Sequence, residues 1–457
     1  MSYAEAISQL NRMVPELYSG PGQPRRKFSL EEIRILLAAL GDPHRRFPAI
    51  LIAGTNGKGS TASSLASILI SSGLRVGLYT SPHLARVNER IRLNRVEIPD
   101  ERFAALYFRV HDAAQQLVLA GELAQMPSFF EMLTAQALLY FAEERVDLAV
   151  LEVGMGGRLD ATNIVDPLFS VITDISLDHT EWLGSTIAAI AREKAGILRP
   201  HGTLVTLPQH PEANQVLGEV AAELEVRGVS ASAYMPPMGT ATSGKYAVEA
   251  LGASILVDSP LAGAHQHRNL ALAIAAAVEL AEVHNYPVTS ASIAEGLHLT
   301  NWPGRLEHIS EGGMEWVLDV AHNPAGAWAL RAGLNSPNIV EGPRTIIFSC
   351  LRDKPILEMA QILFPVFDRV ILVALHAARA AGLDELTAAA EATGSRFATA
   401  DTVSAALALA SSQQDSGLIV VSGSVYLVGE ARTLLLEGPY SGRASHFMEN
   451  SSGRSEP

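Results

Sequence analysis

The amino-acid sequence predicts an α/β protein in which a large domain with a mostly parallel sheet precedes a smaller α/β domain. From residue 49 onward, short β-rich apolar runs alternate with longer helical patterns, which is typical of βαβ units. A proline-glycine pair at residues 303–304 interrupts this alternation, which then resumes. The chain has 457 residues, more than one hydrophobic core usually organises, so two domains are expected.

The first domain is predicted over residues 1–300. Its strands are expected at residues 49–53, 76–79, 148–153 and 169–173. Its helices are expected at residues 60–71, 101–119, 129–144, 187–198 and 267–281. From residue 228 to residue 263, shorter pieces punctuated by glycine and proline, including 246–250 and 254–257, predict a small antiparallel addition.

The second domain is predicted over residues 301–437, where the sequence Asn301-Trp302-Pro303-Gly304 marks its start. Strand candidates at residues 316–320, 345–349, 370–373 and 418–421 are separated by helical segments, which indicates a Rossmann-like α/β domain. Residues 438–457 are rich in Ser, Gly and Glu and lack apolar periodicity. They are therefore expected to form a disordered tail.

The composition argues against several classes of partner. The 34 basic and 48 acidic residues give a net charge of −14, which repels nucleic acid and acidic membrane surfaces. The short basic cluster at residues 24–27 is typical of a solvated loop. The single cysteine, Cys350, allows no intrachain disulfide, and the apolar stretches are too short for a transmembrane helix. We expect a cytoplasmic protein, a monomer, that binds neither nucleic acid nor membranes.

A glycine-rich loop lies between the first expected strand and the helix that follows. It consists of Gly54, Thr55, Asn56, Gly57, Lys58, Gly59, Ser60 and Thr61. Glycines let backbone N–H groups approach phosphates, a helix N-terminus attracts anions, and Lys58 supplies a positive charge. The order of strand, loop and helix predicts phosphate binding by a P-loop-type domain; a glycine-rich turn without nucleotide is the alternative. The spacing differs from the commonest phosphate loop, because Gly59 lies between Lys58 and Ser60.

Six further motifs follow the loop along the chain. They are Thr-Ser-Pro-His-Leu at 80–84, Glu-Val-Gly-Met-Gly-Gly-Arg-Leu-Asp at 152–160, Asp-His-Thr-Glu-Trp-Leu-Gly at 178–184, Arg-Glu-Lys-Ala-Gly-Ile at 192–197, Pro-Gly-Arg at 303–305 and Asp-Val-Ala-His-Asn-Pro at 319–324. With the loop, they resemble the folylpolyglutamate synthase and dihydrofolate synthase family, relatives of the Mur ligases of cell-wall synthesis. The resemblance extends from Gly54 to Arg432, nearly the whole chain.

The resemblance implies an ATP-dependent ligase that adds L-glutamate to dihydropteroate, to folate polyglutamates, or to both, in folate biosynthesis and one-carbon metabolism. A carboxylate does not condense with an amine directly, because its hydroxide is a poor leaving group. The γ-phosphoryl group of ATP would first convert it into an acyl phosphate. Such a site holds ATP, Mg²⁺, the folate-type acid and the amine of glutamate together. The expected cofactors are therefore ATP and Mg²⁺.

The candidate metal ligands follow strands of the predicted parallel sheet. Ser81 follows the strand at residues 76–79, and Glu152 lies at the end of the strand at 148–153, where a parallel sheet opens toward ligands. The resemblance makes both of them magnesium ligands, together with His179. By itself, His179 is typical of a structural or surface histidine, because Mg²⁺ prefers oxygen ligands.

Lys194, taken alone, is typical of a solvated helix residue beside Glu193. It matches the lysine that carries a carbamate in the family. A neutral lysine amine captures CO₂, and the product is an anionic oxygen ligand instead of a cation. The resemblance thus implies that Lys58, Glu152, His179 and Lys194 are catalytic and that Lys194 is a carbamylation site.

Other binding residues follow from the resemblance as well. It implies ATP contacts outside the loop at Asn269, Arg305, Asp319 and His322, in a cleft between the two domains. From the residues alone, Asp319 ends a strand and Asn323-Pro324 begins a helix, which is compatible with ATP contact.

The resemblance also implies folate contacts at Pro82, His83 and Phe129. Aromatic residues suit a flat heterocycle, but Phe129 and Phe130 fit the core face of a helix equally well. Pro355 departs from the family pattern, which has an acidic residue there.

Two other functions are compatible with the loop. A Mur-type amino-acid ligase of peptidoglycan synthesis shares the acyl-phosphate chemistry. The motif at residues 80–84 favours folate, however, and no additional nucleotide-binding domain precedes residue 49. A nucleotide-dependent switch protein would leave Glu152, His179 and Lys194 without a function.

Overall fold

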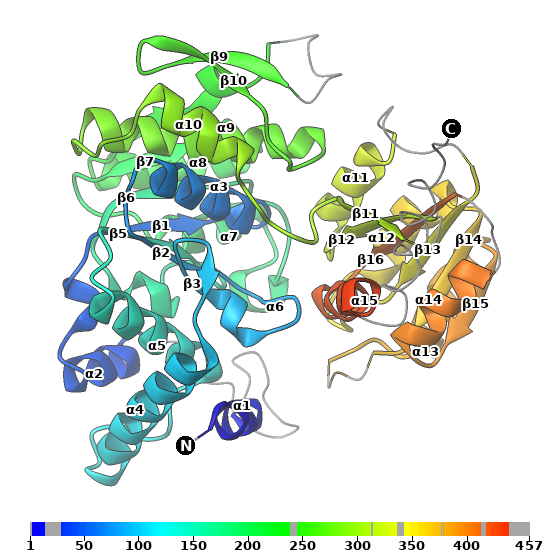
Figure 1. Cartoon of the computed structure of the whole chain (residues 1–457), viewed down its shortest axis with the longest axis horizontal. Coiled ribbons are helices and arrows are strands. Elements are labelled where there is room, and N and C mark those ends of the chain that lie inside the picture. Colours follow the sequence, from blue (N-terminus) through cyan, green and yellow to red (C-terminus); the bar gives the residue numbers. More distant parts are fainter. Residues whose placement is uncertain are drawn as a thin grey trace, which may run out of the picture. The chain divides into compact units, whose positions relative to one another are not determined.

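The computed structural model describes residues 2–13, 29–237, 245–311, 314–335, 342–375, 377, 379–412 and 417–437. The chain forms two compact units (Figure 1). The first consists of Met1–Pro82, Arg86–Pro260 and Gln266–Asn301, and the second of His83–Ala85, Leu261–His265 and Trp302–Pro457. The basic cluster at residues 24–27 and the expected tail at 438–457 lie outside the described residues.

A mostly parallel sheet forms the centre of the first unit. In the described ranges it has eight strands, in the order β4-β3-β2-β5-β1-β6-β7-β8. The strands are β1 (Ala49–Ala53), β2 (Val76–Tyr79), β3 (Ile91–Leu93), β4 (Val96–Glu97), β5 (Leu148–Glu152), β6 (Pro167–Ile172), β7 (Thr203–Thr206) and β8 (Arg227–Ser230). All neighbours from β2 to β8 pair in parallel, whereas β3 and β4 form an antiparallel hairpin at one edge. β1 and β5 are buried along their whole length, as expected for central strands of a sheet covered on both faces.

Helices cover both faces of this sheet (Figure 1). They are α1 (Tyr3–Arg12), α2 (Glu31–Ala39), α3 (Lys58–Ser71), α4 (Asp100–Leu119), α5 (Phe129–Glu143), α6 (Thr180–Leu183), α7 (Ile187–Ala195), α8 (Pro211–Glu223), α9 (Ala264–Glu282) and α10 (Ser290–His298). Helix α3 packs against β1, β2 and β5, and α10 packs on α3. Leu51, Tyr79 and Leu151 belong to the core cluster that includes residues of α4 and α5. Short 3-10 helices are η1 (Pro43–Arg45), η2 (Val87–Arg90), η3 (Ala161–Ile164) and η4 (Ala231–Tyr234).

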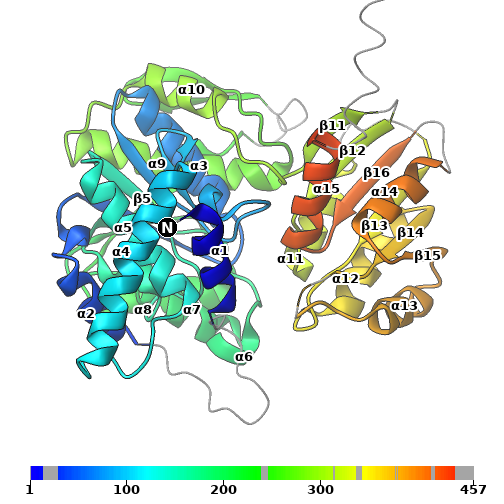
Figure 2. The ribbon, with the colours of Figure 1, turned by 60° about the horizontal axis from the view of Figure 1, so that its bottom comes forward.

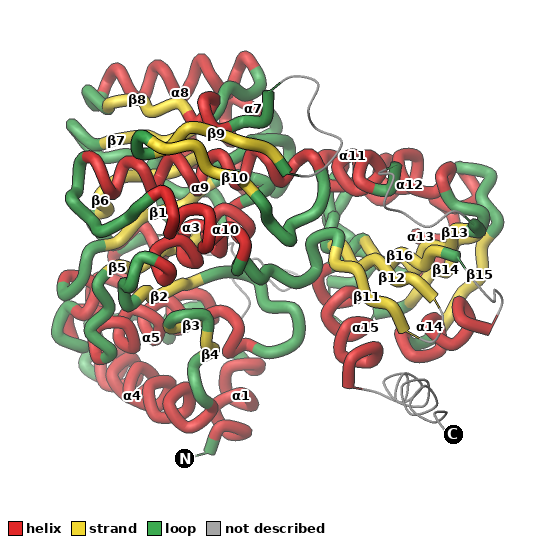
Figure 3. Tube along the Cα trace, turned by 45° about the horizontal axis from the view of Figure 1, so that its top comes forward, coloured by secondary structure: helices red, strands yellow, loops and turns green. Residues whose placement is uncertain are grey.

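A small antiparallel hairpin, β9 (Tyr246–Ala250) and β10 (Ala253–Val257), forms a separate sheet in the first unit (Figure 3). It packs against α10 through β10 and against η4 through β9. The strands show alternating burial, with Tyr246, Val248 and Ala250 buried and the residues between them exposed. The alternation is typical of a strand with one face on a core and the other in water.

The second unit is a smaller α/β sandwich (Figure 2). Its described strands are β11 (Glu307–Glu311), β12 (Met314–Asp319), β13 (Arg344–Phe348), β14 (Arg369–Val373), β15 (Phe397–Ala400) and β16 (Leu418–Ser422), in the order β11-β12-β16-β13-β14-β15. Only β11 is antiparallel among these strands. Its helices are α11 (Pro324–Gly333), α12 (Ile356–Leu363), η5 (Phe364–Val366), α13 (Leu383–Ala392), α14 (Val403–Ser412) and α15 (Val425–Glu437). Ile346 and Phe348 face a core with α11, α12 and α13, whereas Ile347 faces a core with α14 and α15.

The expected fold class is confirmed, and so is the antiparallel addition at β9 and β10. One part of that expectation is wrong: residues 228–230, placed in the addition, belong to β8 and extend the large sheet in parallel. β3, β4, β7, β11 and β15 were not expected either. β8 and β15 are edge strands with mostly exposed or half-buried side chains, so they lack the apolar run by which a buried strand is recognised. No helix in the described ranges is both long and apolar enough to cross a lipid bilayer.

Candidate active site

Several candidate site residues lie at the carboxyl ends of four parallel strands of the first unit. Gly54 follows β1, Ser81 comes shortly after β2, Glu152 ends β5, and Thr173 follows β6. Because these strands run in parallel and neighbour one another, their carboxyl ends meet at one edge of the sheet. Open α/β sheets bind their ligands at this edge, which makes it the candidate active site.

The glycine-rich loop is held against the segment that follows β6. The backbone N–H of Thr55 donates to the carbonyl of Asp174 at 2.8 Å, and Thr55 Oγ1 donates to the carbonyl of Ser176 at 3.0 Å. Thr173 Oγ1 donates to the carbonyl of Asn56 at 2.8 Å. These bonds fix the course of the loop between β1 and α3, as a preformed phosphate cradle requires.

Two positions of the loop require glycine. At Gly54, with φ +153°, a Cβ would lie 1.7 Å from Thr173 Oγ1. At Gly57, with φ +88°, a Cβ would lie 2.1 Å from Oδ1 of Asn269, a buried residue of α9. The carbonyl of Asn269 also accepts a hydrogen bond from Thr61 Oγ1 at 3.4 Å, across 208 positions of sequence. The structure therefore brings Asn269 directly against the predicted phosphate loop.

We expect Gly57→Ala to weaken ATP binding and to destabilise the first unit more than Gly73→Ala does. Both glycines have left-handed backbone, with φ +88° and +83°, which costs another residue roughly 1–2 kcal/mol. Only the Cβ at position 57 would also collide with Asn269, because no described atom lies within 4 Å of the corresponding position at Gly73. Chemical denaturation and nucleotide titration of both variants separate the two effects. Equal stability losses with unchanged ATP binding would contradict this role for Gly57.

Two lysines meet at the loop. Lys58 begins α3, and its Nζ donates to the carbonyl of Thr55 at 3.2 Å. Lys194, in α7, is buried, and its Nζ donates to the carbonyl of Gly54 at 2.7 Å. Burial, together with the like charge of Lys58, lowers the pKa of Lys194 to about 7. The expectation drawn from the residue alone, a solvated helix lysine, is therefore wrong.

The three predicted metal ligands come from three segments at the same edge of the sheet. Glu152 is buried, and its Oε2 accepts a hydrogen bond from the backbone N–H of Ser81 at 3.1 Å. His179 lies just before α6 with φ +49°, and its backbone N–H donates to Oδ1 of Asp178 at 2.8 Å. Asp178 also stabilises the charge of Lys194, so this segment lies near the two lysines. Within the described ranges, no three His, Cys, Asp or Glu side chains are grouped as a ready metal site.

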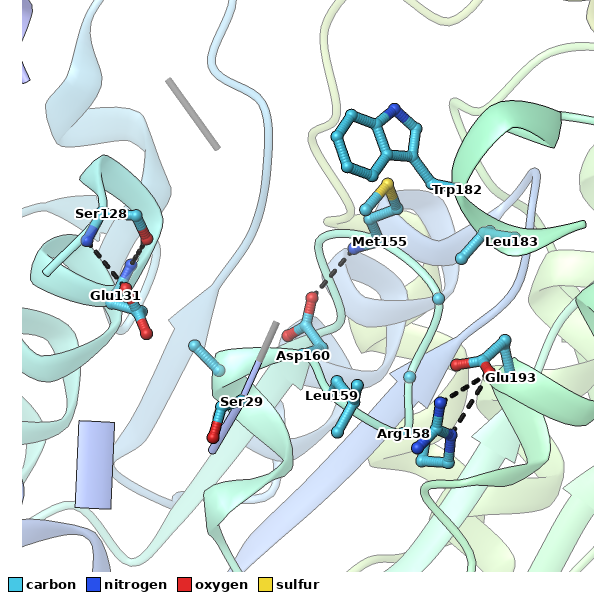
Figure 4. Close-up of a pocket in the computed structure, with 13 residues that line it drawn as sticks. Ser29, Ser128, Glu131, Met155, Arg158, Leu159, Asp160, Trp182, Leu183 and Glu193 are labelled. Carbon is cyan, nitrogen blue, oxygen red and sulfur yellow. Dashed lines mark hydrogen bonds and ion pairs between the residues drawn. The ribbon is translucent and has the colours of Figure 1, made fainter. Parts of the chain in front are cut away.

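A pocket lies next to these residues in the first unit (Figure 4). Its open space measures about 790 Å³, including solvent at its mouth. The start of α5, the turn after β5, α6 and the end of α7 build its wall, and Ser29 adds to it. Arg158 and Glu193 form an ion pair of 2.9 Å on this wall. Asp160, which lines the pocket, interacts electrostatically with Lys194, so the pocket lies near the lysine pair.

Two buried carboxyl groups line this pocket (Figure 4). Glu131 forms a capping box with Ser128 at the start of α5: its N–H donates to Ser128 Oγ at 3.2 Å, and its Oε2 accepts from the N–H of Ser128 at 2.7 Å. Asp160 accepts from the N–H of Met155 at 2.9 Å and from the hydroxyl of Thr162 at 2.6 Å. Burial raises the pKa of Asp160. No role is expected for Asp160 from its residue type alone, although this residue ends the motif at 152–160.

The residues expected on the folate side have different surroundings. Pro82 follows a cis peptide bond and belongs to the first unit, whereas His83 belongs to the second. The ring of Phe129 is partly buried, and the guanidinium of Arg90 lies 5.1 Å from its centroid. Phe130 is a buried core residue. For Phe130, the alternative role on the core face of the helix is therefore correct.

In the second unit, Asp319 ends β12 and is buried. Its two oxygens accept hydrogen bonds from the backbone N–H groups of Ala321 and Leu306, both at 2.9 Å. Asn323 caps α11, and Pro324 occupies the first turn of this helix. The local roles inferred from the residues alone, a strand end and a helix start, are therefore confirmed.

The two other expected ATP contacts of the second unit lie close to Asp319 in sequence. Arg305 donates from Nη1 to the carbonyl of Gly304 at 3.1 Å. His322 is only partly buried, and its Nδ1 lies 2.8 Å from the carbonyl of Val320. Arg305 precedes Leu306, whose N–H binds Asp319, so these residues surround the carboxyl end of β12.

Comparison with known proteins finds similarity to one superfamily over both units. Residues 52–277 match the Mur ligase middle domain, and residues 304–425 match the Mur ligase glutamate ligase domain. The chain is 36% identical over 453 residues to folylpolyglutamate synthase of Lacticaseibacillus casei, covering 96% of this chain and 100% of that one. It is 34% identical over 419 residues to dihydrofolate synthase/folylpolyglutamate synthase of Bacillus subtilis, covering 90% and 95%.

A solved structure supports this relationship. Mycobacterium tuberculosis folylpolyglutamate synthase, complexed with ADP and AMPPCP, matches with a TM-score of 0.82 and 32% identity, over 96% of this chain and 99% of that one. At this coverage, the similarity extends over both units and every motif described above. The chain therefore belongs to the folylpolyglutamate synthase/dihydrofolate synthase family of the Mur ligase superfamily.

Proposed function

We propose that this protein is an ATP-dependent ligase that joins L-glutamate to a folate-type acid, either dihydropteroate or a folate polyglutamate, through an acyl phosphate. One observation is the main support for this proposal. A buried lysine with its pKa lowered to about 7, Lys194, binds the first glycine of a loop whose own lysine, Lys58, begins a helix. A generic nucleotide-binding loop has no need of a second amine whose pKa lies near neutral pH. An enzyme that uses the amine chemically has such a need.

The loop has the features of an ATP-phosphate site. Its backbone N–H groups lead into the N-terminus of α3, where the helix dipole favours negative charge. Lys58 adds a full positive charge at the same point, and Asn269 lies against Gly57 from α9. We assign ATP binding to residues 54–61 and Asn269 of the first unit and to Arg305, Asp319 and His322 of the second. Residues 1–300 would then form the ATP-binding domain and residues 301–437 the glutamate-ligase domain.

The residues at the edge of the sheet fit Mg²⁺. Glu152 is a buried carboxylate and lies beside Ser81, whose hydroxyl is a second oxygen donor. His179 and a carbamate on Lys194 would complete the set. When bound, the ion would neutralise charge on the phosphate groups. The protein side chains hold ATP in position, bring the carboxylate of the acid toward the γ-phosphoryl group, and exclude water from the acyl phosphate.

The pocket in Figure 4 suits the heterocyclic end of the acid. It combines the aromatic ring of Trp182 and the side chain of Met155 with the two buried carboxyl groups of Glu131 and Asp160. A pterin presents a flat ring face and several N–H groups, which such a mixed apolar and acceptor-lined wall recognises. Pro82, His83 and Phe129 remain proposed folate contacts outside the wall of this pocket. We further propose that the enzyme acts in the cytoplasm as a monomer.

The experiment that tests this function measures ADP release with three acceptors, each combined with L-glutamate. We expect release with dihydropteroate, with tetrahydrofolate, or with both, and none above background with a muramoyl nucleotide. Dependence on dihydropteroate alone indicates a dihydrofolate synthase, and dependence on tetrahydrofolate alone a folylpolyglutamate synthase. The product mass distinguishes ligation from uncoupled ATP hydrolysis. ADP release that depends on neither folate acid would disprove the proposal.

A further inference from the structure

A second pocket of the first unit is lined by two arginines and shares no lining residue with the pocket in Figure 4. It lies among α3, β2, the β3–β4 hairpin and the segment that follows α10, elements that lie close together in Figure 3. Its open space measures about 510 Å³, including solvent at its mouth. Apolar side chains form much of the wall: Ala66, Ile70, Val76, Leu78 and Leu299. None of the residues that line it is acidic.

Arg95 reaches this pocket from a tight turn. Asn94 and Arg95 connect β3 to β4 with φ +46° and +69°, the left-handed pair of a hairpin turn that favours glycine at its second position. Nη2 of Arg95 donates to Ser67 Oγ at 3.0 Å and to Ser71 Oγ at 3.3 Å, both on α3. The described residues show hydrogen bonds from Nη2 alone, which leaves Nε and Nη1 available to a ligand.

Arg92 provides the second guanidinium. It lies directly opposite Leu78 in the antiparallel pairing of β2 and β3, so both side chains stand on the same face of the sheet. Its side chain is only 15% exposed, and its Nη2 lies 3.9 Å from Oε1 of Glu97, too far for a hydrogen bond. Glu97, which forms this long ion pair with Arg92, is not among the residues that line the pocket.

The hydroxyl groups of the pocket are already engaged. Ser63 Oγ donates to the carbonyl of Asn301 at 3.3 Å, and Ser67 Oγ donates to the carbonyl of Gly296 at 2.6 Å. Recognition of a ligand would thus depend on the guanidinium groups, which bind carboxylates and phosphates through paired N–H groups. The chain has a net charge of −14, yet the wall of this pocket has two arginines and no acidic residue, a composition that favours an anionic ligand.

We propose that this pocket binds a small organic anion, with its carboxylate or phosphate group between Arg92 and Arg95 and a short apolar part against Ile70 and Leu299. Such a ligand would contact α3, the helix that begins with Lys58, and the last segment of the first unit. None of the residues that line this pocket is assigned to the proposed ligase reaction, so the site is independent of that activity.

Calorimetric titration of the full chain with inorganic phosphate and with glutarate tests this site. AMPPCP and L-glutamate are kept saturating, so that binding at the proposed active site does not contribute. Arg95→Gly removes the guanidinium and places glycine where the left-handed turn favours it, so this variant is expected to fold. Arg92→Gln keeps a polar side chain on β3. Arg34→Gln, at an exposed arginine of α2, is the control with the same change in charge.

We expect at least one probe to bind, and each pocket variant to weaken its binding about tenfold or more, because a charge-assisted hydrogen bond is lost. Arg34→Gln should bind like the wild-type protein. Binding of phosphate alone identifies a phosphoryl ligand, and binding of glutarate alone a carboxylate. Absence of binding by both probes at millimolar concentration would overturn the proposal. So would unchanged affinity in Arg92→Gln and Arg95→Gly, whether or not folate ligation is observed.

Discussion

Lys58→Ala should reduce the turnover number of ATP-dependent ligation by roughly 10²–10³-fold, the usual loss when one group that stabilises transition-state charge is removed. Lys58 is the cation that begins α3, at the point where the loop presents its N–H groups. Phosphoryl transfer depends on positioning and charge neutralisation, and no other side chain of the loop carries positive charge. Steady-state ADP release with saturating substrates measures the loss.

The fold should survive this substitution. Lys58 is only partly buried, and its one described hydrogen bond is the 3.2 Å contact with the carbonyl of Thr55. Its removal is therefore expected to change the free energy of unfolding by about 1 kcal/mol or less. Lys245→Ala is a matched control, because this exposed lysine pairs with Asp258 at the small hairpin, away from the loop. Near-normal turnover in Lys58→Ala would refute the role given to this residue.

The strands that the sequence predicts best are those with two buried faces. β5 contains the apolar run 148–151 and β13 the apolar run 346–348, and the structure buries nearly every residue in both strands. β8 and β15 were not predicted, because their side chains are mostly exposed or half-buried at sheet edges. Their pairing depends on the neighbouring strand and the twist of the sheet, which a local pattern does not contain. For this reason residues 228–230, which belong to β8, were placed in the antiparallel addition instead of the large sheet.

In the candidate site too, features formed by contiguous residues are predictable from the sequence, whereas contacts between residues far apart in the sequence are not. The loop at residues 54–61 is recognisable because strand, glycines, lysine and helix are contiguous. Burial of Lys194 was not predictable from its helix, because its partner, the carbonyl of Gly54, lies 140 positions away. Asn269 reaches Gly57 from a helix that lies still farther away in the sequence. In both cases the resemblance to the family implied a role for the residue, and only the tertiary structure gives its physical basis.

Lys194→Met should abolish most ligation and remove a carbamate that we expect on the wild-type protein. The amine of Lys194 is neutral in a large fraction of molecules near neutral pH, because burial and Lys58 lower its pKa to about 7. A neutral amine adds CO₂ to form a carbamate and releases one proton, whereas a protonated amine does not react. With ¹³C-bicarbonate, NMR of the wild-type protein with AMPPCP and Mg²⁺ should show a carbamate carbon that is absent in Lys194→Met. An active wild-type complex without this signal would contradict carbamylation.

The same variant tests the lowered pKa itself, in CO₂-free buffer and without ligands. The folded-state pKa of Lys194 is about 7, whereas the unfolded chain keeps the ordinary value of 10.5. Between these values the unfolded chain binds a proton that the folded protein lacks, so the wild-type free energy of unfolding rises with pH relative to Lys194→Met. The rise is at most ~1.4 kcal/mol per pH unit. This contribution is complete above pH 10.5 and is lost as the pH falls toward 7, below which the two curves run parallel. Urea denaturation from pH 6 to pH 9 measures the difference, and parallel curves over this whole range would show that Lys194 stays protonated in the folded protein.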